Sequence, residues 1–111
     1  MPISLKIKMK VDKDISVAFI TCVGENIKTK RQEKKLSLED LGLEIGLTRM
    51  QIHRIEKGYN ITMTSLLKIS LALHVNPDEL VKFDYKFKKE DLEKLVSTNK
   101  ASKLRPKEIP D

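Results

Sequence analysis

Polar and apolar side chains follow two different periods along this chain. Residues 4–11 alternate strictly, with four apolar side chains on one side and three lysines on the other. A period of two is typical of a half-buried β-strand, so a short strand is predicted there. Between residues 15 and 82 the apolar residues recur every three or four positions, which predicts a series of helices. A second alternating run at 83–88, with three aromatic residues, predicts another strand.

The first helix is predicted over residues 15–35, with Asp14 placed to cap it. Gly24 lies near its middle, and because glycine is a poor helix former we expect the helix to weaken or break there. The side turned toward the core carries four apolar residues: Phe19, Ile20, Val23 and Ile27.

The stretch LEDLGLEIGLTRMQIHRIEK, residues 38–57, is the most informative part of the chain. Leu38, Leu41 and Ile45 are spaced by three and four, so they line one face of a short helix. Gly42 lies where a second helix would cross closely. Gly46 can adopt a positive φ at the end of the first helix without a Cβ penalty. The pattern predicts a helix followed by a tight turn.

A second short helix follows this turn. Thr48 is a natural N-cap for it, because its hydroxyl can accept a hydrogen bond from a free N–H. Ile52 and Ile55 face inward, and the outward side is suited to base edges in a major groove. That side consists of Arg49, Met50, Gln51, His53 and Arg54. Such helix pairs also occur in ordinary bundles, but both glycines and the basic side favour a DNA-binding helix-turn-helix.

Further helices are predicted beyond this pair. Thr62 is expected to cap a helix over 63–74. Asn76 is expected to cap a short helix over 77–81 that buries Leu80, with Pro77 in its first position. After the aromatic run, a stripe of two leucines and a valine predicts a last helix over 89–97.

Residues 23–80 resemble the phage-repressor/Cro-type helix-turn-helix family, also known as the xenobiotic-response-element family. The likeness rests on three segments: VGENIKTKRQEKKLSLEDL, GLTRMQIHRIEKG and TSLLKISLALHVNPDEL. It implies an all-α, five-helix repressor-like DNA-binding domain. It also implies a transcriptional regulator that binds double-stranded DNA sequence-specifically.

Roles for individual residues follow. Base contacts are expected from Arg49, Met50, Gln51, His53 and Arg54. Arg31 and Glu56 match a pair that forms a structural salt bridge in the family. The family usually has a phosphate-binding Gln where this chain has Leu38, so one fewer contact to the DNA backbone is expected, unless Ser37 or a nearby Lys replaces it. Phosphate contacts are expected from Lys28, Ser37, Thr48, Lys57, Tyr59, Asn60, Thr62, Thr64 and Ser65.

The 111 residues suffice for one small domain with tails. We expect an N-terminal arm or strand over 1–14 and the helix-turn-helix DNA-binding domain over 15–82. A strand plus a short helix, a possible dimerisation extension, is expected over 83–98. The polar residues 99–111 are expected to form a disordered tail.

A homodimer is expected, because one recognition helix reads too few base pairs to mark a site in a genome. Two copies about one DNA turn apart, roughly 34 Å, read an inverted-repeat operator. The runs at 4–11 and 83–88 could pair, within one chain or across the dimer, as the dimerisation element. The alternative is a basic arm and a loop packed on the core.

Composition limits other functions. The net charge of +6 favours polyanionic partners, and the single cysteine suits a reducing cytoplasm. No segment is long and apolar enough to span a membrane. No glycine-rich phosphate loop, metal-ligand spacing or nucleophile pair is found, so no enzyme activity, metal or cofactor is expected.

The main expectation is a cytoplasmic, nucleoid-associated regulator. The alternative is the antitoxin of a toxin–antitoxin pair, which would bind a toxin as well as DNA. Among regulators, a restriction–modification controller and a phage-type repressor both remain open.

Overall fold

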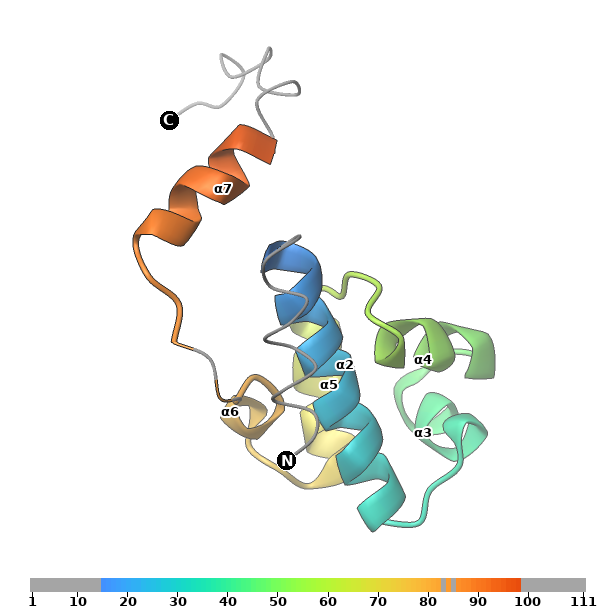
Figure 1. Cartoon of the computed structure of the whole chain (residues 1–111). Coiled ribbons are helices and arrows are strands. Elements are labelled where there is room, and N and C mark those ends of the chain that lie inside the picture. The colour runs from blue at the N-terminus through green and yellow to red at the C-terminus, as the bar shows by residue number, and fades with distance from the viewer. Residues whose placement is uncertain (1–14, 83, 85, 99–111) are drawn as a thin grey trace.

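The computed structural model describes residues 15–82, 84 and 86–98. Within these residues the chain forms helices and no strand: α2 (Ile15–Glu33), α3 (Leu38–Ile45), α4 (Arg49–Glu56), α5 (Met63–Leu73), α6 (Pro77–Leu80) and α7 (Glu90–Thr98). The predicted all-α fold is confirmed. The helices α2 and α5 pack together in the centre, with α3 and α4 on one flank and α6 on the other (Figure 1).

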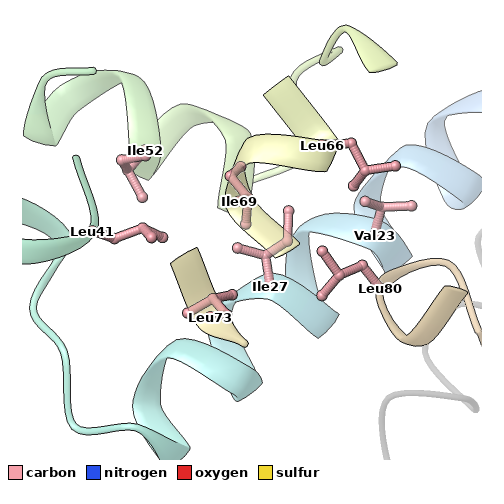
Figure 2. Packing of buried hydrophobic residues seen from close by; sticks show 8 residues of the cluster. All are labelled: Val23, Ile27, Leu41, Ile52, Leu66, Ile69, Leu73 and Leu80. Atoms are coloured by element: carbon pink, nitrogen blue, oxygen red, sulfur yellow. The ribbon is translucent and has the colours of Figure 1, made fainter. Parts of the chain in front are cut away.

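The core lies where α2 to α6 meet (Figure 2). Its central cluster consists of Val23, Ile27, Leu41, Ile52, Leu66, Ile69, Leu73 and Leu80. Each of these five helices contributes at least one side chain, so moving any helix away removes apolar area from the cluster. Burying a side chain of this size is worth about 1.5–3 kcal/mol. Such packing stabilises helices that would be marginal in isolation.

The first helix differs from its prediction in two respects. It runs through Gly24 without a break. Phe19, predicted to face the core, is 40% exposed, and Ile20 is half-buried. Ala18 is small and escaped a pattern based on large apolar residues, yet it lies fully buried, and Cys22 is fully buried as its place in an apolar run predicts. The buried apolar stripe of α2 is Ile15, Ala18, Cys22, Val23 and Ile27.

Helix ends deviate by one or two residues from the predictions. The helix α2 ends at Glu33, and Lys35 in the following turn adopts a left-handed φ of 57°. The helix α5 ends at Leu73 because His74 also becomes left-handed, with φ 58°. Asn76 stands at the N-cap of α6, but its side chain forms no capping hydrogen bond.

Of the two predicted strands, only the second lies partly within the described residues. Residues 4–11, Asp14 and the tail 99–111 lie outside the described residues. In the run at 83–88, the described residues 84 and 86–88 form no strand. Phe87 packs edge-on against Phe19 of α2 instead, with ring centroids 6.0 Å apart. Packing against a helix therefore takes the place of the predicted sheet in this part of the chain.

Candidate nucleic-acid interface

The turn between α3 and α4 is closed by local hydrogen bonds. Gly46 caps α3 in the left-handed conformation, with φ 75°, and its N–H donates to the carbonyl of Gly42. The N–H of Leu47 donates to the same oxygen at 2.9 Å. A Cβ on Gly42 would lie 2.4 Å from the Leu47 carbonyl oxygen. The element that crosses Gly42 is therefore the turn itself, where a second helix was predicted.

Both short helices begin with a reciprocal capping box. In α3, Ser37 Oγ accepts from the Asp40 N–H and the Asp40 carboxylate accepts from the Ser37 N–H, both at 2.9 Å. The bond from the Ser37 N–H, followed by the Ser37 side chain, lowers the pKa of the Asp40 carboxyl. In α4, Thr48 Oγ1 accepts from the Gln51 N–H at 3.1 Å, and Gln51 Oε1 accepts from the Thr48 N–H at 2.8 Å. Gln51 thus uses its oxygen in the cap and keeps its NH₂ group as a donor.

The outward side of α4 is open to solvent. The five residues expected to face DNA are all exposed, whereas Ile52 on the opposite side is fully buried. Arg49 and Arg54 form no ion pair within the described residues, whose salt bridges use Lys30 and Arg31. The helix α4 therefore presents two unpaired guanidinium groups on the flank opposite α6 (Figure 1).

A buried ion pair fixes the far end of α4 to α2. Arg31 Nε donates to Glu56 Oε2 at 2.7 Å, and a second guanidinium nitrogen donates to Oε1 at 3.0 Å. A third, Nη1, donates to the Leu36 carbonyl at 2.8 Å. Glu56 lies at the C-terminus of α4, where the helix dipole disfavours an anion. The positive charge of Arg31 therefore offsets the cost of burying the Glu56 carboxylate and its unfavourable place in the helix dipole. The pair holds α4 in position and does not face outward.

Two glycines missed by the sequence reasoning also hold α4 against α2. A Cβ on Gly24 would lie 2.5 Å from the Ile55 carbonyl oxygen and 2.7 Å from that of Glu56. Gly58 has a φ of 105°, and a Cβ there would meet Thr21 Oγ1 at 2.8 Å. Close approach of two backbones explains Gly24, whereas the positive φ and the adjacent Thr21 side chain explain Gly58. Their signal in the sequence was a glycine inside a helix and another just after a helix.

A shallow groove runs beside α4, between this helix and the start of α5. It has a volume of about 280 Å³, and its polar lining is Gln51, Arg54, Tyr59, Asn60, Thr62 and Ser65. Thr62 caps α5 by accepting from the Ser65 N–H at 3.0 Å, and Asn60 Oδ1 accepts from the Ile61 N–H at 2.8 Å. The fold thus brings residues expected to touch bases and residues expected to touch phosphates together in one groove.

The remaining residues expected at phosphates are not among those lining this groove. Lys28 is exposed on α2, Ser37 caps α3, and Lys57 is the exposed C-cap of α4. Thr48 lies at the start of α4, and Thr64 is exposed in the first turn of α5. These side chains are therefore spread over four elements.

Comparison with known proteins identifies the family. A helix-turn-helix family profile matches residues 27–80. The chain is also similar to the solved structure of the restriction-modification controller protein C.AhdI from Aeromonas hydrophila, at 31% sequence identity and a TM-score of 0.56. This likeness covers 60% of the present chain and 97% of the controller protein. The chain belongs to the phage-repressor/Cro-type helix-turn-helix family. No curated protein matches it.

Membership of this family makes the protein a helix-turn-helix DNA-binding regulator, and α4 is the second helix of its motif. Within the described residues, no helix combines the length and apolar character needed to cross a membrane.

Proposed function

We propose that this helix-turn-helix regulator binds a specific operator as a homodimer, with α4 of each copy in the major groove. The main support for this proposal is the outward side of α4. It is exposed, it bears two arginines, and within the described chain neither arginine has an anionic partner. Binding to DNA therefore breaks no internal ion pair, and the cations are available for base edges and phosphates.

Each outward side chain of α4 suits a particular base edge. Arg49 and Arg54 are assigned to guanine, because one guanidinium can donate to both O6 and N7. Met50 is assigned to a thymine methyl group. Gln51 offers its NH₂ as a donor, and His53 completes the surface. A good bidentate contact discriminates between bases by about 1–3 kcal/mol.

The phosphate backbone is assigned to the groove beside α4 and the side chains around it. The first turn of α5 supports this assignment, because helix N-termini have free N–H groups and a partial positive charge. Hydroxyl and amide groups cluster at the same place. The residues assigned to phosphates are Lys28, Ser37, Thr48, Lys57, Tyr59, Asn60, Thr62, Thr64 and Ser65.

A second copy is assigned to the outer side of α5. Met63, Leu67 and Leu71 are spaced by four, so they form one stripe, and they are exposed by 79%, 47% and 64%. A stripe of large exposed apolar residues marks an interaction surface, and the same stripe on a twofold-related copy is complementary to it. None of these residues belongs to α4, so both reading helices remain accessible, about 34 Å apart for adjacent half-sites.

The likeness to C.AhdI favours one subclass of regulator. We propose that this protein controls restriction–modification genes, as the name of the solved relative suggests. An operator obtained by site selection should then lie upstream of such genes in the source genome, and its consistent absence there would contradict this subclass.

Site selection from random duplex DNA at a stated salt concentration tests the main proposal. We expect an inverted repeat. Arg54→Ala should lower affinity for the selected operator about 5- to 150-fold and relax the preference at particular base pairs, because it removes a base contact. Lys57→Ala should weaken all sequences alike and reduce the salt slope by about 1.

Lys82→Ala is the matched control. Lys82 is exposed and comes shortly after α6 in the chain, and α6 lies on the opposite flank from α4 (Figure 1). Its removal should therefore leave the sequence preference intact. The proposed reading surface is wrong if Arg54→Ala binds the selected operator as tightly as the parent.

A further inference from the structure

An apolar groove lies between the N-terminal part of α2 and α7, on the opposite side of α2 from α4. Its volume is about 360 Å³, and its apolar walls are Ile15, Phe19, Phe87, Leu92 and Leu95. The edge-on contact of Phe19 with Phe87 joins the two walls. Asp91, which is buried, accepts from the Lys88 N–H at 2.9 Å and so caps α7. The groove is therefore built by specific contacts at the start of α7.

This groove is an addition to the common DNA-binding domain. The family match ends at residue 80 and begins at residue 27, so both walls lie outside it. Almost the whole of C.AhdI is covered by 60% of this chain. The family match therefore does not account for the apolar side chains of these walls.

The walls remain substantially open. Phe19 and Phe87 are 40% and 41% exposed, and Leu92 on α7 is 53% exposed. A short helix such as α7 gains little stability from its own hydrogen bonds. Apolar contact on a second side of α7 would therefore stabilise it.

We propose that the groove binds the N-terminal arm of the same chain, with Leu5, Ile7, Met9 and Val11 turned toward α2 and α7. The arm is joined directly to Ile15, which is itself a wall residue. An extended chain advances about 3.3 Å per residue, and the nine residues of α7 span about 13 Å. The seven residues from Leu5 to Val11 therefore reach about 20 Å, enough to follow α7 along the groove, and their period of two directs every second side chain inward.

The charges of the N-terminal arm and of α7 are complementary. The lysines at positions 6, 8 and 10 alternate with the apolar residues and would face water. The first turn of α7 carries the exposed Glu90 and Glu93, which complement these cations. A second copy fits less well, because a stable dimer buries about 1,200–2,000 Å² in total, more than one nine-residue helix and a small groove can supply.

The period of two supplies a matched pair of variants for the test. In the full chain without DNA, Ile7→Ser/Met9→Ser removes two inward side chains, whereas Lys8→Ser/Lys10→Ser changes only the outward side. Hydrogen exchange of the α7 amides is measured in both. The first variant should accelerate this exchange about tenfold or more, because α7 loses apolar contact. The second should leave it at the parent rate.

Two outcomes overturn the proposal on this readout: equal exchange in all three proteins, or equal acceleration by both variants. A cross-linking experiment decides whose arm is bound. Met9→Cys/Leu92→Cys should form a disulfide within one chain, since Cys22 is buried and does not compete. Disulfides that link two chains, when the two single variants are mixed, would contradict binding by the same chain. Neither readout involves DNA, so the inference stands or falls independently of operator binding.

Discussion

Replacing Gly24 with alanine has two opposite effects on the free energy of unfolding, a gain in helix propensity and a loss from overpacking. Alanine in a helix interior is favoured over glycine by about 1 kcal/mol, so from the sequence alone this change should stabilise α2. In the structure the added methyl group would lie 2.5 Å from the Ile55 carbonyl oxygen, 2.7 Å from that of Glu56 and 2.9 Å from the Glu56 carbonyl carbon. All three atoms belong to backbone, so no side chain can rotate out of the way.

The packing effect should be the larger of the two. Ordinary contact begins at 3.4 Å, so the C-terminal end of α4 must retreat from α2 by roughly 1 Å. Overpacking of this kind typically costs 1–3 kcal/mol and occasionally more. A retreat would also strain the buried Arg31–Glu56 pair in the same place. We expect a net loss of about 1–2 kcal/mol and a fall in melting temperature of roughly 4–16 °C.

Thermal and urea unfolding followed by circular dichroism measure this loss. Thr29→Ala is the control, because Thr29 is an exposed residue of the same helix and also receives an alanine. It should be neutral or stabilise by a few tenths of a kcal/mol. A melting temperature for Gly24→Ala at or above that of the parent would refute the close-packing argument.

Three further changes test the structure. Glu56→Gln should cost about 3–5 kcal/mol in urea unfolding, because it leaves Arg31 buried with an uncompensated charge, and Arg31→Met/Glu56→Leu should recover part of that loss. Burial raises the pKa of the Cys22 thiol to about 12, so a thiol-reactive dye at pH 8 should label the protein only as it unfolds. The free energy of unfolding should fall as the pH rises from 9 to 12, because in this range the thiol ionises only in the unfolded chain. The lowered pKa of Asp40 predicts the opposite dependence: its contribution is present above the ordinary carboxyl pKa and is lost as the pH falls, and Asp40→Asn should abolish this part of the acid sensitivity.

Features encoded by neighbouring residues could be predicted from the sequence. The left-handed cap at Gly46 and the N-caps at Thr48 and Thr62 appear where the pattern placed them. The reason is that a cap depends on the two to four residues beside it. The spacing of apolar residues in α3 and α4 was informative for the same reason.

Features that depend on distant residues could not be predicted in this way. The sequence pattern marked Gly24 as a helix breaker because its actual neighbours, Ile55 and Glu56, are 31 and 32 positions away along the chain. Phe19 and Phe87 each fitted an apolar pattern, but nothing in either pattern indicates that the two rings meet and close one side of a groove. Alternation at 83–88 fitted a strand equally well, since period two does not distinguish a sheet from an extended segment packed on a helix.

The helix α4 is held at both ends, and this explains why so short an element can present its side chains in a defined orientation. Its start is fixed by the Thr48–Gln51 capping box. Its end is fixed by the Arg31–Glu56 pair and by backbone contact with Gly24. An isolated eight-residue helix would be mostly unfolded in water. Because these restraints use the inward side and the two ends of α4, the two outward arginines have no ion-pair partner among the described residues. The proposed entry of α4 into a major groove would therefore need little further ordering of its backbone.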